Sequence, residues 1–439
     1  MKKLIPILFL AIQACVTAQD IKPKLLRAGK LFNSETGIFM TDMAILLDGS
    51  VIKAVKPFKE VTQKETSESE LIDLSKYAVL PGLIDAHTHL LYREEIVPGN
   101  WPTGMDMIRT LTMEGDAFRA IYGGVRAKAY LEAGITTVQD LGNSGQFADM
   151  ALRKAIKEGI VPGPNMRCSG PGLCSSGGQV PGLLYKHQQV INDEYRIIKG
   201  VDDAVQAVRE NVTQGADVIK IYSNNTPNVT ALSIEEMQAI VKEAHRYGVR
   251  VTAHATNNTA IYNAVISGVD GIEHGYQVDD TTLELMAKKK VVLVPTDGDL
   301  FTTNRYFQLA FPNDTTQRAR GAEGRTFLKD RLQRAIKKGV MIVAGSDDYV
   351  NFKMPFSEPS KRTLIGYLEA GMPIADVLKA ATANAALHLG WPGKLGVIKQ
   401  GAYADIIAVD PDLDKNIYAI MKVHFVLQDG KIAVTRLKE

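Results

Sequence analysis

Residues able to bind a divalent metal ion recur at intervals along this 439-residue chain. Imidazole nitrogens and carboxylate oxygens are ligands of zinc and related ions. Each candidate metal-binding residue follows a short apolar run rich in β-branched residues. In chain order the candidates are His87 with His89, Lys220, His254, His274 and Asp347. Because the strands of a parallel β/α barrel carry their functional residues at their carboxyl ends, this placement predicts a metal site at the mouth of such a barrel.

The first two histidines show most directly how such a site would form. His87 and His89 are separated by one residue in the strand-like segment 81–89. Side chains alternate between the two faces of a strand, so both imidazoles would point to the same side and meet one cation. Two histidines packed inside a barrel without metal are the alternative for this pair alone. The further candidate ligands favour the metal site.

Eight strand-like segments after residue 78 would carry these residues. Most are continuous apolar runs, as expected of strands buried on both faces, and helical stretches lie between them. One helix is marked by a capping box from Ser233 to Glu236 and by a stop at Gly248. The alternation predicts an α/β fold, a (β/α)8 TIM barrel. The segments are 79–90, 136–141, 165–169, 217–222, 250–255, 271–275, 291–296 and 341–347.

Short alternating strands with Asp-Gly turns lie on both sides of this region, in residues 24–57 and 396–434. Neither flank alone has enough strand to cover a hydrophobic face. We therefore expect one small β-sandwich built from residues 19–78 and 394–439, beside a barrel of residues 79–393. Long loops after the first, third and seventh barrel strands should shape the substrate pocket.

The N-terminus has the layout of a secretory signal peptide. Lys2 and Lys3 precede a short apolar stretch, and small residues lead up to Ala18. The stretch is far shorter than the ~20 residues of a membrane span. We expect a signal peptide of residues 1–18 and export, to a bacterial periplasm, rather than a transmembrane protein. An uncleaved anchor and a lipoprotein attached through Cys15 are the alternatives.

The composition restricts the partners and leaves the cysteines open. Lys and Arg number 51 against 49 Asp and Glu, so no basic field favours nucleic acid as a partner. We expect a small-molecule or small-peptide substrate, and a homo-oligomer is possible. After removal of the signal peptide only Cys168 and Cys174 would remain. An oxidising compartment permits a disulfide between them, and buried free thiols are the alternative.

The motifs around the candidate ligands resemble those of the metal-dependent amidohydrolase superfamily, and the similarity extends over essentially everything after the signal peptide. Within that superfamily the chain is most similar to the branch of imidazolonepropionase-like proteins and metal-dependent Xaa-Pro or Xaa-Arg dipeptidases. The matching motifs are Gly82-Leu-Ile-Asp-Ala-His-Thr-His89, Ala216-Asp-Val-Ile-Lys-Ile-Tyr222, Thr252-Ala-His254, Gly271-Ile-Glu-His-Gly275, Ala344-Gly-Ser-Asp347, Thr382-Ala-Asn-Ala-Ala386 and Gly401-Ala-Tyr-Ala-Asp405.

The resemblance implies two divalent metal ions, with zinc as the expected metal. His87 and His89 would bind the first ion, and His254 and His274 the second. Lys220, carboxylated on its side-chain nitrogen, would bridge both. An unmodified lysine is a poor ligand because its ammonium, with a pKa of about 10.4, repels cations. A snorkelling or salt-bridged lysine is the alternative.

The catalytic assignment falls on an aspartate pair. The resemblance implies that Asp347 contacts the first metal and acts as the general acid/base. Asp348 follows it directly, and strand alternation would turn only one of the two inward; the motif favours Asp347. No Glu follows His254 in the arrangement expected of deaminases, which together with Lys220 argues against deamination.

Two residues are candidates for contact with the substrate. Tyr222 lies two positions after Lys220 on the same strand face, where its hydroxyl would polarise a carbonyl or hold a carboxylate. A plain interior tyrosine is the alternative. Gln179 ends Ser176-Gly-Gly-Gln179, where relatives often have Thr-Gly-Gly-His, so specificity transfers poorly from them.

We therefore expect an exported binuclear metallohydrolase that cleaves an amide C–N bond by means of a metal-activated water, with Asp347 as general acid/base. Small peptides are the first substrate class. Cyclic amides, lactones and phosphotriesters are the enzymatic alternatives. A catalytically silent relative with a binding or structural role is the alternative from another class, although such a protein would be expected to lose ligands.

Overall fold

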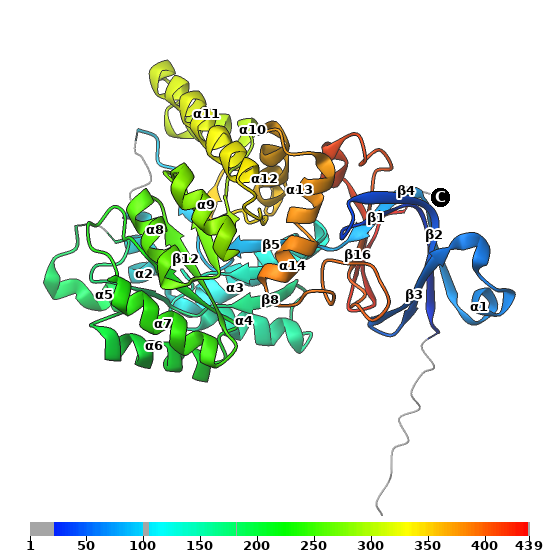
Figure 1. Ribbon diagram of the computed structural model, residues 1–439, viewed down its shortest axis with the longest axis horizontal. Coiled ribbons are helices and arrows are strands. Elements are labelled where there is room, and N and C mark those ends of the chain that lie inside the picture. The colour runs from blue at the N-terminus through cyan, green and yellow to red at the C-terminus, as the bar shows by residue number, and fades with distance from the viewer. Residues whose placement is uncertain (1–21, 100–104, 181, 438–439) are drawn as a thin grey trace, which may run out of the picture.

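The computed structural model describes residues 22–99, 105–180 and 182–437, so the predicted signal peptide and Cys15 lie outside the described residues. A barrel with surrounding helices lies beside a smaller β-domain (Figure 1). This arrangement confirms the predicted TIM barrel with a sandwich. No helix in the described part of the chain combines the length and the apolar character that crossing a membrane requires.

The β-domain joins the two ends of the chain, shown in blue and red in Figure 1. Its sheet has the order β18-β17-β16-β4-β1-β2-β3. Leu26, Leu74 and Ile406, from three distant parts of the sequence, share one buried core. The strands are β1 (Lys24–Asn33), β2 (Ile38–Asp48), β3 (Val51–Pro57), β4 (Glu70–Pro81), β16 (Ile406–Val409), β17 (Val423–Gln428) and β18 (Lys431–Thr435).

The barrel begins slightly later than the sequence predicts. Segment 79–90 was expected to be one barrel strand, but it is divided at Gly82. Val79 and Pro81 still belong to β4 and pair with β16 of the sandwich, and β5 (Leu83–Thr88) starts the barrel. A side chain at Gly82 would overlap Thr136, so only glycine permits this close crossing. The sandwich therefore extends to Pro81 rather than ending at residue 78.

The barrel strands are parallel and follow one another in chain order. One ladder contains β5, β7 (Ile135–Asp140) and β8 (Asn165–Cys168). A second contains β11 (Val218–Tyr222), β12 (Arg250–Ala255), β13 (Gly271–His274) and β14 (Val292–Val294). A backbone hydrogen bond of 2.9 Å from Asp217 to Cys168 connects the two ladders.

The eighth predicted strand, residues 341–347, closes the barrel without forming a regular ladder. Val343 donates a backbone hydrogen bond to Leu293 on one side, and Ala344 accepts one from Ala86 on the other. Asp347 then donates to the carbonyl of His87 at 2.8 Å. Asp347 has a φ of 53°, a left-handed conformation that ends regular pairing. The same hydrogen bond places Asp347 next to the His87 backbone.

Helices follow the strands and pack on their outer face, and their apolar residues complete the largest buried cluster. The Ser233 side chain accepts a hydrogen bond from Glu236 in the predicted capping box. The main helices are α3 (Gly115–Glu132), α4 (Ala148–Lys157), α6 (Val201–Thr213), α7 (Ile234–Arg246), α8 (Asn258–Ser267), α9 (Asp280–Lys289), α11 (Thr315–Lys337), α12 (Glu358–Glu369), α13 (Ile374–Ala380) and α14 (Ala383–His388).

Candidate active site and metal centre

All the predicted metal ligands line one cavity at the carboxyl ends of the barrel strands. The cavity has a volume of about 640 Å³, within the range of small-molecule sites. Each strand contributes in turn, because parallel strands end at the same rim. The ligands are His87 and His89 from β5 and its end, Lys220 from β11, His254 from β12, His274 from β13 and Asp347 from the closing segment.

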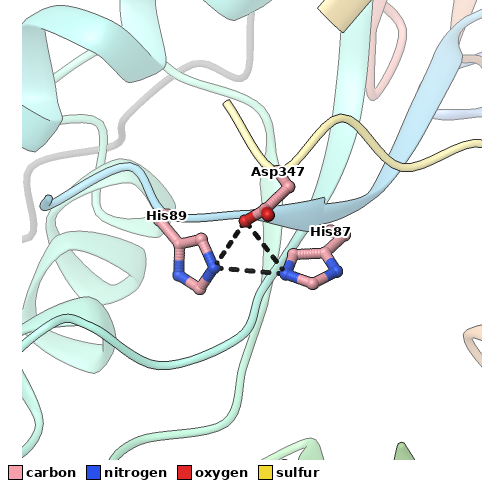
Figure 2. Close-up of side chains that lie close together, drawn as sticks. All are labelled: His87, His89 and Asp347. Carbon is pink, nitrogen blue, oxygen red and sulfur yellow. Dashed lines mark hydrogen bonds and ion pairs between the residues drawn. The ribbon is translucent and has the colours of Figure 1, made fainter. Parts of the chain in front are cut away.

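Three of these side chains converge on one point, as Figure 2 shows. The Nε2 atoms of His87 and His89 are 3.2 Å apart. Oδ1 of Asp347 lies 3.0 Å from Nε2 of His89 and 3.4 Å from Nε2 of His87. Two donor atoms that each lie about 2.1 Å from one zinc ion at tetrahedral angles are about 3.4 Å apart. The spacing of this cluster therefore fits a single metal ion.

The rings of both histidines are oriented by contacts on their other nitrogen. Nδ1 of His87 lies 2.7 Å from Oε2 of Glu273, and Nδ1 of His89 donates to the carbonyl of Gly142 at 2.9 Å. Such contacts on one nitrogen fix the ring and leave the lone pair of the other for a metal. Glu273 in turn accepts a hydrogen bond from Thr252.

Glu273 is a functional residue that the sequence analysis missed. It directly precedes His274, and alternation along a strand would place only one of the two in the interior. His274 has a φ of 68°, which breaks the alternation, so both side chains reach the site. The sequence does contain a signal for Glu273. A charged residue inside an otherwise apolar barrel strand is rarely buried without a partner, so such a residue can be expected to have a function.

The second group of predicted ligands adjoins the first. The rings of His254 and His274 are 4.7 Å apart between centroids, and those of His274 and His87 are 5.2 Å apart. Nδ1 of His274 lies 2.9 Å from the hydroxyl of Thr296, so its Nε2 is available. Nε2 of His254 lies 3.2 Å from the amide nitrogen of Gln179.

Lys220 lies deep in this group and is only 1% exposed. Its Nζ is 3.4 Å from Nε2 of His87 and 5.5 Å from the centre of the Tyr222 ring. Burial lowers the pKa of its amine, although the charges of Glu273 and Asp347 oppose this effect. Within residues 22–99, 105–180 and 182–437 it forms no ion pair with an acidic side chain. The described residues therefore give no support to the salt-bridged alternative for this lysine.

The protonation states suit a cation. Burial, and then the charge of Lys220, lower the pKa of His87 and of His254 well below 6.5. Burial also lowers the pKa of His274 in this way, so these imidazoles are neutral at pH 7 and keep a lone pair. Burial raises the pKa of Asp347, but His87 and His89 outweigh it and the net pKa is lowered. Neutral imidazoles with an ionised carboxylate are the donor set that divalent metals require.

The two predicted substrate contacts also line the cavity. The hydroxyl of Tyr222 donates to Oδ1 of Asn143 at 3.0 Å, and burial keeps the pKa of this phenol well above 10. Gln179 enters from the loop after the third strand. The long loop after the seventh strand, expected to shape the pocket, contributes none of the described lining residues. Tyr349 after the closing segment and Thr226 after β11 take part instead.

Asp348 points away from the cavity, in line with the sequence analysis. Its carboxylate accepts a hydrogen bond from the Tyr130 hydroxyl at 2.9 Å and lies 3.5 Å from Nη2 of Arg126. Arg126 also donates to the carbonyls of His89 and Tyr92, both at 2.7 Å. The pair therefore joins the loop after β5 to the loop that carries Asp347.

The two cysteines are buried as free thiols, so the structure holds no disulfide between them. Burial raises the pKa of Cys168 well above 9. Cys174 is likewise enclosed, in the strand that follows β8. A thiol in such surroundings is an inert packing group rather than a nucleophile.

Comparison with known proteins agrees with this site. The model of the amidohydrolase family matches residues 78–436. Ochratoxinase of Aspergillus niger is 27% identical over 428 residues, 90% of this chain and 82% of that protein. Imidazolonepropionase of Solibacter usitatus is 26% identical over 400 residues, 84% of this chain and 86% of that protein.

A solved structure described as a Xaa-Pro dipeptidase with methionine bound in the active site superposes with a TM-score of 0.78 and 26% identity. The match covers 93% of this chain and 99% of that one. Members of the family use divalent metal ions and act on small substrates, which agrees with the converging His87, His89 and Asp347. The chain belongs to the amidohydrolase family and is a hydrolase that acts on amide C–N bonds.

Proposed function

We propose that the protein is a binuclear metallohydrolase that cleaves the amide bond of small peptides, as a dipeptidase does. The observation that carries the proposal is the sharing of one cavity by two adjoining ligand groups, with Lys220 among them. Nζ of Lys220 lies 3.4 Å from Nε2 of His87, and the Lys220 side chain lines the cavity together with His254 and His274. Similarity to a structure named as a Xaa-Pro dipeptidase supports small peptides as substrates.

The donor set suggests how two ions would be held. His87, His89 and Asp347 would hold one ion, and His254 with His274 the other. We propose zinc because it favours imidazole nitrogen together with carboxylate oxygen. When bound, such ions lower the pKa of a water molecule and polarise a carbonyl group.

Lys220 would be present as a carbamate. The neutral amine would form an N–C bond with carbon dioxide, the electrons of one C=O π bond would move to its oxygen to give a carboxylate, and the nitrogen would release a proton to water. A buried ammonium without an acidic partner is unfavourable, and next to a metal-binding imidazole it would repel the metal. The carbamate replaces that positive charge with a two-oxygen anion suited to bridging.

Asp347 would act as the general acid/base. Its Oδ1 contacts the first pair of histidines and its Oδ2 lies 3.9 Å from Nδ1 of His274, so it borders both ligand groups. The ionised carboxylate would accept a proton from the attacking water and pass it to the leaving nitrogen. The Tyr222 hydroxyl, which donates its one proton to Asn143 in the structure, would turn to donate that hydrogen bond to the substrate.

The test combines metal analysis with a substrate panel. Purified protein should contain about two metal ions per chain, and the metal-loaded enzyme should cleave members of a dipeptide library in preference to hydantoins and lactones. Activity confined to lactones or phosphotriesters would refute amide cleavage of peptides. We also propose export through the N-terminal segment, and fractionation of expressing cells should place the mature protein outside the cytoplasm.

A further inference from the structure

A second acidic side chain, Glu94, lines the same cavity but belongs to neither ligand group. Only 7% of the residue is exposed. The basic side chains nearby are engaged elsewhere, since Lys353 pairs with Glu95 at 2.6 Å and Arg93 with Glu114 at 3.0 Å. Glu94 takes part in none of the ion pairs among the residues the structure describes. A buried carboxylate without a cation is unfavourable, so a positively charged ligand would stabilise the ionised Glu94 side chain.

The position of Glu94 is fixed by the loops that carry the metal-binding residues. The short strand β6 (Glu94–Glu95) pairs in parallel with β15 (Val350–Asn351). The backbone amide of Glu94 donates to the carbonyl of Tyr349 at 2.9 Å. β6 follows His89 and β15 follows Asp347, so this pairing ties the backbone of Glu94 to the two segments that carry these predicted ligands.

The surroundings of Glu94 are aromatic and negatively charged. Tyr92 and Tyr349 line the cavity here, with ring centroids 5.4 Å apart. Burial raises the pKa of Glu94 to about 7, and the negative charge of Asp106 adds to this shift. A side-chain hydrogen bond with Tyr92 opposes the shift but is weaker. Aromatic faces and a carboxylate both attract cations. Apart from Lys220, no described lysine or arginine lines the cavity.

We propose that Glu94 binds a positively charged group of the substrate, an ammonium or a guanidinium. The inference rests on the proposed peptide substrates, which offer such a group in two places. One is the free N-terminal ammonium, and the other is a basic side chain. In either case N–H donors would approach the carboxylate from the cavity, and the rings of Tyr92 and Tyr349 would enclose the cation.

The test uses Glu94→Gln, which keeps the size and removes the charge. Glu95→Gln is the matched control, because the neighbouring carboxylate bonds Lys353 and Asn351 rather than lining the cavity. Two substrate pairs differ in one charge each: leucyl-proline with N-acetyl-leucyl-proline, and leucyl-lysine with leucyl-norleucine. A hydrogen bond to a charged group is worth roughly 1.5–3 kcal/mol, so kcat/KM should fall about 10- to 100-fold for the charged member.

The pattern of losses identifies the source of the cation. A loss on leucyl-proline that is absent on its N-acetyl form assigns Glu94 to the N-terminal ammonium. A loss on leucyl-lysine alone assigns it to a basic side chain. Equal changes within both substrate pairs, or a change no larger than that of Glu95→Gln, would overturn the proposal.

A binding measurement separates this inference from the proposed function. L-Leucinol carries an ammonium but no amide, and isohexanol is its counterpart without the amine. Calorimetry on the metal-loaded protein should show that the native chain prefers leucinol and that Glu94→Gln loses the preference. This holds even if the native enzyme cleaves none of the peptides, which would refute the proposed function alone. An unchanged preference in Glu94→Gln would refute binding of the N-terminal ammonium by Glu94, and an unchanged ratio of kcat/KM between leucyl-lysine and leucyl-norleucine would refute binding of a basic side chain.

Discussion

Neighbouring aspartates at the end of the closing segment have different surroundings, and replacing each by asparagine should separate catalysis from stability. Asp347 faces the cavity and lies 3.0 Å from Nε2 of His89. Asparagine keeps an oxygen that coordinates a metal but does not accept a proton at working pH. General acid–base groups contribute about 10²–10⁴-fold. We expect Asp347→Asn to keep most of its metal and its fold and to lose kcat by that range, about 2.7–5.4 kcal/mol in activation free energy.

Asp348→Asn should produce the opposite pattern. Its carboxylate accepts from Tyr130 and compensates the charge of the buried Arg126. Breaking a buried ion pair by removing one partner costs about 3–5 kcal/mol. The remaining bonds of Arg126 to the carbonyls of His89 and Tyr92 should keep the loss towards the lower end of that range. The variant should therefore unfold at lower temperature while its folded fraction retains metal and most of its kcat.

The assay pairs steady-state kinetics with elemental analysis and thermal unfolding on the same preparations. Because both variants replace an aspartate by its isosteric amide, each serves as the control for the other. The reasoning would be refuted if Asp348→Asn were inactive at native stability while Asp347→Asn kept its activity. That result would shift the proton-transfer role by one residue.

Four further predictions follow from the same contacts. His87→Ala or His89→Ala should lose one metal ion per chain and nearly all activity; elemental analysis that finds the native metal content in both would contradict the assignment. Lys220→Ala should be inactive, and acetate or propionate with added metal should restore part of the activity by supplying two oxygens; full activity without rescue would argue against a carbamate. Glu273→Gln should weaken metal binding about 10- to 100-fold in chelator competition, because Glu273 orients the ring of His87. Burial raises the pKa of Asp149 to about 7, so the folded state binds the proton of this carboxyl more tightly than the unfolded state does. The protonated Asp149 therefore contributes to stability at acid pH, and this contribution is lost as the pH rises through about 7. The stability of Asp149→Asn relative to the native chain should therefore rise between about pH 4 and about pH 7. Denaturant unfolding that shows a parallel pH dependence in both proteins would contradict this.

The convergence of the predicted ligands could be expected from the sequence because two simple structural rules act together. Alternation along a strand places His87 and His89 on one side, and parallel strands bring their ends to one rim. These rules need no knowledge of packing. They also predicted the joining of the two chain ends, since neither flank could cover a hydrophobic face alone.

What the sequence did not reveal depends on local backbone conformation. Gly82 divides a continuous apolar run because it crosses Thr136 too closely for any side chain. His274 and Asp347 have positive φ angles, and alternation cannot be extended through a left-handed residue. Glu273 was missed for this reason, although it directly precedes a recognised ligand.

The role of Glu94 illustrates a second limit. Its sequence neighbours, Arg93 and Glu95, suggest a solvated run of charges, and alternation gives no reason to separate them. Only the folded chain shows that Arg93 and Glu95 find partners outside the cavity while Glu94 is enclosed with aromatic rings. The absence of a counterion is a property of the whole neighbourhood rather than of any motif. A substrate that carries the missing positive charge would explain why the fold tolerates this buried acid beside its metal site.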